Sequence, residues 1–240
     1  MKNPRLLIGL LGLMLSLVAQ AAGPERVRVQ TSLGSFVIEL QRDRAPLTVE
    51  NFLGYVKTGH YTNTLFHRTI ANFVIQGGGV GLDYKAVPTL KPIPNEAGNG
   101  LKNLRGTVGL ARASGPHSGD AQFYVNVADN GDLDPLPTRW GYAVFGRVVE
   151  GMEVVDRISV SPTGSMGPFK QDAPIQAVVI QKIELLPDSS TGAEAAAPAP
   201  TPSPAPGPAA PATDNPAPTP PPAGETPSAD PAARAPQPKQ

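Results

Sequence analysis

Apolar and polar residues alternate along residues 26–31 and again along residues 34–40. A period of two is the pattern of a half-buried strand, and a tight turn between two such runs is typical of a β-hairpin. The spacing becomes helical over residues 45–59, where Pro46 suits the first helical turn and Gly59 the end. One face of that segment is apolar at Val49, Phe52, Leu53 and Val56. These residues therefore predict a hairpin followed by a helix.

Short runs rich in β-branched and aromatic residues follow the helix, separated by glycine and proline. They cover residues 64–69, 72–76, 106–112, 121–128, 141–149 and 175–186. A second, shorter helix is predicted over residues 151–159. Residues 77–105 show little pattern and are expected to form a surface loop that borders a site. Many short strands with two helices favour a mainly β fold, either an antiparallel barrel or a sandwich, over an alternating βαβ sheet.

Residues 1–21 are interpreted as a signal peptide. Lys2 and Arg5 precede an apolar run over residues 6–18, which ends in the small-residue pattern of residues 19–21. A membrane-spanning helix needs roughly 20 apolar residues, more than this run provides. We therefore expect cleavage near Ala21 and export of a protein that is not bound to the membrane.

Residues 187–240 have a composition unlike the rest of the chain. They hold more than half of the 29 prolines and almost no large apolar side chain. Such a segment cannot bury enough apolar surface to offset the entropy lost on folding, so a disordered, Pro/Ala-rich tail is predicted. The remaining residues 22–186 are long enough for one domain with its own core.

Composition excludes several classes of function. The 20 Lys and Arg balance the 20 Asp and Glu, so neither nucleic acid nor an anionic membrane surface is expected as a partner. The chain has no cysteine and its three histidines lack metal-ligand spacing, so no metal or other cofactor is expected. The glycine-rich residues 77–81 lack the Gly-Lys-Ser/Thr of a phosphate-binding loop. His117, Ser118 and Asp120 are too close in sequence to form a hydrolase triad. The absence of a heptad pattern favours a monomer.

The segment FHRTIANFVIQGGG, residues 66–79, keeps Arg68 and Gln76 within a strongly apolar stretch. A buried charge is costly unless it is paired or used, so Arg68 needs an explanation. Three further blocks follow in order, at residues 95–112, 121–134 and 141–158. In order and spacing the four blocks resemble those of the cyclophilins. The segments NVADN and GYAVFG are similar to those of the exported bacterial members of that family.

The resemblance implies a closed eight-stranded antiparallel β-barrel capped by two α-helices, with the active site on its outer face. It also implies peptidyl-prolyl cis-trans isomerase activity on unfolded or flexible proline-containing polypeptides, here during the folding of exported proteins in the periplasm. Arg68 matches the catalytic arginine of the family, and Gln76 matches the glutamine that hydrogen-bonds the substrate backbone. The positions that match substrate-binding residues are Phe73, Val74, Ala111, Arg112, Gln122, Tyr124, Leu133 and Tyr142.

Several positions depart from the usual family pattern. Val74 replaces a common Met, which predicts a slightly shallower proline pocket, and Tyr124 replaces Phe, which adds a hydroxyl that needs a partner if buried. Arg112 replaces Asn, so we expect the contact at this position to use the main chain. Tyr142 stands where eukaryotic members commonly have His. Asp132 replaces a Trp that many members use to hold cyclosporin, so weak cyclosporin binding is expected.

Two other interpretations stay open from the sequence. The domain could hold proline segments without turning them over, as a binding or chaperone module, although the presence of Arg68 favours catalysis. The proline-rich tail could be the working part, as a spacer or as a segment that binds the domain itself. We expect that removal of the tail leaves peptide turnover unchanged.

Overall fold

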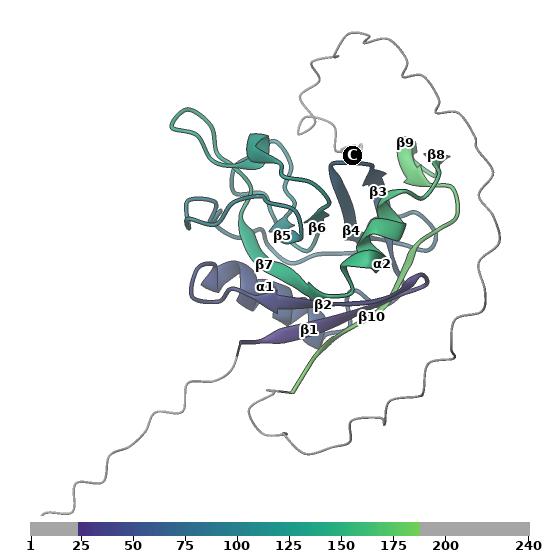
Figure 1. Ribbon diagram of the computed structural model, residues 1–240, viewed down its shortest axis with the longest axis horizontal. Helices are drawn as coiled ribbons and strands as arrows, with labels where there is room; N and C mark the ends of the chain where they lie inside the picture. The colour runs from purple at the N-terminus through teal and green to yellow at the C-terminus, as the bar shows by residue number, and fades with distance from the viewer. Residues whose placement is uncertain (1–23, 188–240) are drawn as a thin grey trace, which may run out of the picture.

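The computed structural model describes residues 24–187. Eight strands close into an antiparallel barrel in the order β1-β10-β3-β4-β6-β5-β7-β2 (Figure 1). These strands are β1 (Arg26–Thr31), β2 (Gly34–Leu40), β3 (Thr64–Ile70), β4 (Val74–Gly81), β5 (Thr107–Leu110), β6 (Phe123–Asn126), β7 (Val144–Glu150) and β10 (Val179–Leu185). The predicted eight-stranded barrel is confirmed. The predicted signal peptide, and all of the predicted tail but Pro187, lie outside the described residues.

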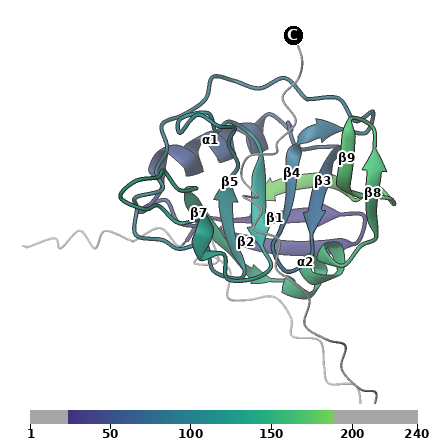
Figure 2. The same cartoon turned by 90° about the horizontal axis from the view of Figure 1, so that it is seen from above.

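Two helices accompany the barrel, α1 (Pro46–Lys57) and α2 (Met152–Ser159). Figure 2 shows them on opposite sides of the strands. Both were predicted from helical spacing, and both are confirmed within about two residues of the predicted ends. Within the described part of the chain, neither is long and apolar enough to cross a membrane. A short 3-10 helix, η1 (Gly131–Leu133), and a separate hairpin of β8 (Thr163–Met166) and β9 (Phe169–Pro174) complete the fold.

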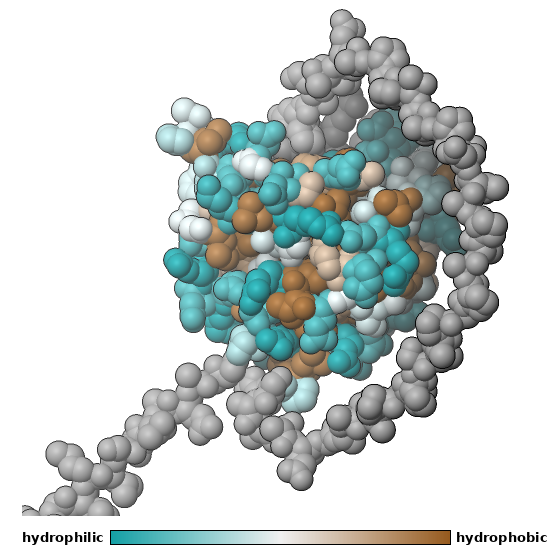
Figure 3. Space-filling view, in the orientation of Figure 1, coloured by the Kyte–Doolittle hydropathy of each residue, from teal (hydrophilic) through white to brown (hydrophobic). Residues whose placement is uncertain are grey.

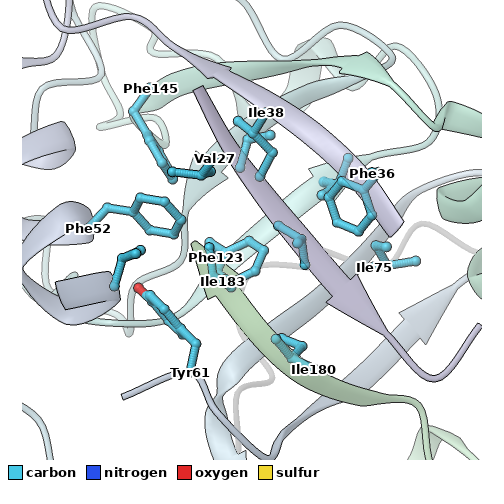
Figure 4. Packing of buried hydrophobic residues seen from close by; sticks show 14 of the residues in the cluster. Val27, Phe36, Ile38, Phe52, Tyr61, Ile75, Phe123, Phe145, Ile180 and Ile183 are labelled. Carbon is cyan, nitrogen blue, oxygen red and sulfur yellow. The ribbon is translucent and has the colours of Figure 1, made fainter. Parts of the chain in front are cut away.

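The barrel interior is filled by aromatic and branched side chains from the strands and from α1 (Figure 4). Phe52 on α1 packs edge-on against Phe123 of β6, with ring centroids 5.7 Å apart, and lies 5.1 Å from the ring of Phe145. All three rings are almost fully buried. Burial of a phenylalanine stabilises the fold by about 1.5–3 kcal/mol, so α1 is held mainly by this apolar face.

The predicted loop of residues 77–105 is wrong at its start, because Gly77–Gly81 belong to β4. Glycine weakens a strand in isolation, but close packing requires it here. A Cβ at Gly77 would lie 2.9 Å from the carbonyl oxygen of Leu65, and one at Gly79 would lie 2.4 Å from Cγ of Gln122. The strand at the end of the domain is also shorter than predicted, since it begins at Val179 and not at residue 175.

The rest of the long loop is tied to the barrel by its polar residues. The Glu96 carboxylate accepts hydrogen bonds from the backbone N–H groups of Leu47 at 3.1 Å and Thr48 at 2.8 Å. Glu96 therefore caps the start of α1, where the residue before the helix, Ala45, has no side chain able to do so. Asn99 Nδ2 donates to the carbonyl of Val144 at 2.9 Å. These bonds hold the loop against the same side of the barrel as β7.

Candidate active site

A second apolar cluster lies apart from the main core. Tyr124 of β6 belongs to it, whereas its neighbours Phe123 and Val125 belong to the core of the barrel. Because successive side chains of a strand point to opposite faces, this outer cluster lies on the outside of the barrel. Its buried members are Val74, Ala111, Tyr124, Leu133 and Tyr142, with half-buried Phe73 packed against them. The structure thus brings together most of the residues that sequence reasoning assigned to a proline pocket.

Arg68 and Gln76 lie directly opposite each other on β3 and β4. Arg68 Nη1 donates to Gln76 Oε1 at 3.2 Å, and Gln76 Nε2 donates to Gln122 Oε1 at 3.0 Å. On its other side, Gln76 pairs with Tyr124 across β4 and β6. This row of hydrogen-bonded side chains fixes the guanidinium beside the outer cluster.

The half-buried position of Arg68 affects the pKa of its guanidinium but not its charge. Burial lowers the pKa of the guanidinium below its ordinary value, whereas the nearby Asp172 and Tyr142 act in the opposite direction. An arginine keeps its proton in proteins even so, and the site holds a permanent cation. Since the local dielectric constant is lower than in water, hydrogen bonds from this cation are strengthened.

Tyr124 finds the partner that its extra hydroxyl requires. Its Oη donates to Asn103 Oδ1 at 2.6 Å, in a fully buried contact. Burial raises the pKa of the phenol well above its ordinary value, so the hydroxyl stays protonated at neutral pH. Its ring packs edge-on against Tyr142, with the centroids 6.1 Å apart. The two tyrosines therefore form a fixed corner of the outer cluster.

Arg112 has a structural contact that the sequence did not suggest. Its guanidinium carbon lies 4.4 Å from the centroid of the Tyr142 ring, in a cation-π contact. Its Nη2 donates to the carbonyl of Trp140 at 2.9 Å and its Nη1 to that of Ala113 at 3.0 Å. The side chain is thus bound to its own protein, and the contact of a substrate with the main chain at this position stays a prediction.

No metal-binding group accompanies the outer cluster within residues 24–187, and the histidine next to Arg68 is uncharged at neutral pH. His67, next to Arg68, is buried, and desolvation lowers its pKa to about 4, so it is neutral at pH 7. The described residues contain no group of His, Cys, Asp and Glu side chains able to hold a metal ion. The chemistry available is that of hydrogen bonding, a fixed cation and an apolar surface.

Sequence reasoning missed three residues that support this site, Asn103, Asn126 and Asn130. All are buried, and Asn130 donates to the carbonyl of Phe73 at 2.9 Å. The only sign of these residues in the sequence was that polar residues occur within the blocks at 95–112 and 121–134. Their burial becomes visible only in the folded chain.

This closed antiparallel barrel carries an apolar cluster and a fixed cation on its outer face. Comparison with known families identifies it further. The profile of the family "Cyclophilin type peptidyl-prolyl cis-trans isomerase/CLD" matches residues 26–185. The chain belongs to this family, and it is a peptidyl-prolyl cis-trans isomerase.

Individual relatives agree with this assignment. A peptidyl-prolyl cis-trans isomerase of Streptomyces antibioticus is 52% identical over 163 residues, which cover 67% of this chain and 98% of the relative. Peptidyl-prolyl cis-trans isomerase B of Escherichia coli is 48% identical over 160 residues, covering 65% and 97% of the two chains. Among solved structures, a Cryptosporidium parvum cyclophilin determined in the presence of the dipeptide Ala-Pro has a TM-score of 0.56 at 26% identity, and the match covers 68% of this chain and 99% of that one.

Proposed function

We propose that this isomerase acts on X-Pro bonds of exported polypeptides in the periplasm and assists their folding. In this proposal the outer cluster is the proline pocket, Arg68 is the catalytic residue, and Gln76 holds both the guanidinium and the substrate backbone. The observation that carries the proposal is the hydrogen-bonded row from Arg68 through Gln76 to Gln122, which holds a cation beside an apolar pocket.

The reaction needs a cation because of how an amide twists. Resonance keeps the peptide bond planar with a barrier of about 18–20 kcal/mol. As the X-Pro bond rotates, the nitrogen pyramidalises and its lone pair becomes localised and basic. A donor fixed beside that nitrogen stabilises the twisted state more than either planar state. Arg68 supplies this donor, and no covalent bond forms or breaks.

The apolar pocket supplies the second part of the effect. Phe73, Val74 and Leu133 surround the proline ring and exclude water, which strengthens the hydrogen bond from Arg68. A fall in the exchange time from about 100 s to about 10 ms is a rate acceleration on the order of ten-thousandfold. It lowers the activation free energy by about 5.5 kcal/mol. One charged hydrogen bond in a site from which water is excluded, together with the pocket, is sufficient for an effect of this size.

The proposed substrates follow from the pocket and from a relative. The Cryptosporidium cyclophilin was determined in the presence of Ala-Pro. The apolar side chains of the outer cluster suit a proline ring preceded by alanine. Ala111 and Arg112, at the edge of the outer cluster, would receive the peptide backbone. On the face in Figure 3 apolar residues are scattered among polar ones, which favours a monomer.

Export is supported by the sequence alone. The basic start, short apolar run and small residues of positions 1–21 have the composition of a signal peptide. Separation of periplasm and cytoplasm, followed by N-terminal sequencing of the purified protein, tests this proposal. A mature N-terminus near Ala22 in the periplasmic fraction is expected, whereas intact Met1 in the cytoplasm would contradict export.

Weak cyclosporin binding is proposed because Asp132 precedes the pocket residue Leu133 at the position where many family members have Trp. Calorimetric titration of the protein and of an Asp132→Trp variant measures the contribution of this residue. The variant is expected to bind cyclosporin more tightly by about tenfold or more, since an aromatic contact and a donor are restored. Equal affinities would contradict the proposal.

A protease-coupled assay with an Ala-Pro-Phe reporter peptide tests the catalytic role of Arg68. The protein is expected to accelerate the slow cis-trans isomerisation of the peptide, and the Arg68→Ala variant is expected to lose most of that acceleration. If both accelerate equally, the fold and family stand but the mechanism is wrong. If neither accelerates while both still bind the peptide, the alternative of a non-catalytic binding or chaperone module is correct.

A further inference from the structure

Three buried asparagines lie behind the outer cluster. Asn103, Asn126 and Asn130 are only 1%, 0% and 9% exposed. Asn126 follows Tyr124 by two residues on β6 and therefore faces the same side of the sheet. Asn103 comes from the long loop before β5, and Asn130 immediately precedes η1. Side chains from three separate segments thus meet beneath the proposed pocket.

Two of these asparagines, Asn103 and Asn130, bind walls of the pocket. Asn103 Oδ1 accepts the hydroxyl of Tyr124 at 2.6 Å. Asn130 Nδ2 donates to the carbonyl of Phe73 at 2.9 Å, and the backbone carbonyl of Asn130 accepts the backbone N–H of Leu133 at 2.9 Å. The three walls come from β6, the β3–β4 turn and η1, so contacts between these segments set their separations. One such contact is a backbone bond, from the N–H of Val127 to the carbonyl of Phe73 at 2.9 Å, and the asparagine side chains add to it.

The asparagines are also bonded to one another. Asn130 Nδ2 donates to Asn126 Oδ1 at 2.7 Å, and Asn126 Nδ2 donates to Asn103 Oδ1 at 3.2 Å. At the far end, the backbone and side-chain N–H groups of Asn103 donate to Asp134 Oδ1 at 2.8 and 2.9 Å. None of these three side chains is among the unsatisfied buried groups of residues 24–187. A fully satisfied buried network of this kind is rigid.

We propose that Asn103, Asn126 and Asn130 are positioning residues that set the width of the proline pocket, a role that rests on the proposed function of the outer cluster. The network holds Phe73, Tyr124 and Leu133 at fixed separations. A pocket of fixed width binds the proline ring in the planar and the twisted amide alike. Its loss should therefore raise KM and leave kcat nearly unchanged, the opposite of the effect expected for Arg68.

Asn130→Asp in the full protein is the sharpest test, because it keeps the size of the side chain and removes its donor. An ionised Asp at this position would face two acceptors, the Phe73 carbonyl and Asn126 Oδ1. At about pH 8, KM for an Ala-Pro-Phe peptide, measured by NMR exchange, is expected to rise about tenfold with kcat within about twofold. Protonation restores a donor, so KM is expected to return toward the parent value near pH 5, whereas the parent shows no such change.

Tyr61→Phe is the matched control. It deletes a buried hydroxyl that donates to the carbonyl of Ala121 at 2.8 Å, outside the outer cluster. It is expected to lower the melting temperature without a change in KM. If Asn130→Asp does not fold, Asn103→Ala is the second variant. It removes the hydrogen bond to Tyr124, whereas Asn130→Asp removes the one to Phe73.

Two outcomes contradict the proposal. A folded network variant whose KM matches the parent, while its melting temperature falls like that of Tyr61→Phe, would show that the network only stabilises the fold. A rise in KM that persists unchanged at about pH 5 would show that the lost donor is not the cause. A Phe73→Ala variant distinguishes failure of the network hypothesis from failure of the proposed proline pocket. An unchanged KM for Phe73→Ala would mean that the outer cluster does not bind proline.

Discussion

Arg68 and His67 are neighbours on β3, yet Arg68 is a cation and His67 is neutral. The Arg68 guanidinium is half buried and bonded to Gln76, and it keeps its proton. The His67 ring is 5% exposed and stacks on Phe169 of β9 at a centroid distance of 5.2 Å. Burial and the adjacent cation both disfavour its charged form. A neutral histidine beside a permanent cation fits a reaction that moves no proton.

His67 should make the stability of the protein depend on pH. Its folded pKa of about 4 lies below its ordinary value of 6.5, so the unfolded chain takes up a proton first as the pH falls. Its contribution to the free energy of unfolding is complete above about pH 6.5 and is lost as the pH falls toward 4. At pH 4 the loss amounts to about 3 kcal/mol. Urea unfolding of the protein and of His67→Phe, followed from about pH 7 to pH 4, measures this effect.

The variant is expected to show a flatter pH profile than the parent, because it removes the titrating ring and keeps the stacking on Phe169. His117→Asn, which replaces an exposed histidine, is the control for loss of a histidine. Parallel profiles for the parent and His67→Phe would contradict the assignment.

At the scale of elements, the segments that follow a local pattern were predictable from the sequence. The hairpin of β1 and β2, α1 and α2 each bury one regularly spaced apolar face, and each forms where predicted. The glycine-rich half of β4 was not predictable. Its glycines are required by close contacts with Leu65 and Gln122, which are distant in sequence. The hairpin of β8 and β9 was missed because its residues, most of them exposed or half-buried, show no regular alternation of apolar and polar side chains in the sequence.

The same distinction applies to the candidate site. Arg68, Gln76 and the pocket residues were inferred from the resemblance to the cyclophilins, and the structure brings most of them together. The buried asparagines were not inferred, because the partners of Asn103 and Asn130 lie 21 and 57 residues away, at Tyr124 and Phe73. A polar residue in a sequence is expected at the surface until such long-range partners are known.

Glu96 should stabilise α1 although it lies outside the helix. Its carboxylate accepts bonds from the N–H groups of Leu47 and Thr48 and from the Thr48 hydroxyl, the last at 2.7 Å. Because these groups have no partner within the helix, Glu96→Ala is expected to lower the free energy of unfolding by about 1–2 kcal/mol. Glu153→Ala, in the exposed first turn of α2, is the control and is expected to cost about 0.5 kcal/mol or less. Equal losses in urea denaturation would contradict the capping role.

At the scale of the whole molecule, a single barrel performs two separate tasks. The inner face buries the core, and the outer face of β3, β4 and β6 carries the side chains that we propose to be catalytic. The side chains of each strand alternate between these tasks, as Phe123 and Tyr124 do on β6. Stability and catalysis can therefore be changed independently by substitutions at adjacent positions.

Deletion of residues 187–240 is expected to leave kcat/KM within about twofold of the full chain. The barrel closes through β10, which ends at Leu185, so the deletion leaves all eight strands of the barrel in place. Although the deleted segment contains Ala-Pro bonds, a weak intramolecular ligand lowers activity only if its effective concentration exceeds its dissociation constant. The reporter-peptide assay on both forms measures this. A several-fold rise on deletion would show that the segment occupies the site.

The central claim is that Arg68 stabilises the twisted amide and not merely the bound peptide. The most direct test is NMR exchange spectroscopy on a saturating Ala-Pro-Phe peptide, which measures cis-trans interconversion on the enzyme separately from the dissociation constant. For Arg68→Ala we expect a bound-state interconversion rate that is slower on the order of a hundredfold, with a dissociation constant within about threefold of the parent. An unchanged interconversion rate with weakened binding would contradict it and make Arg68 a residue of substrate affinity alone.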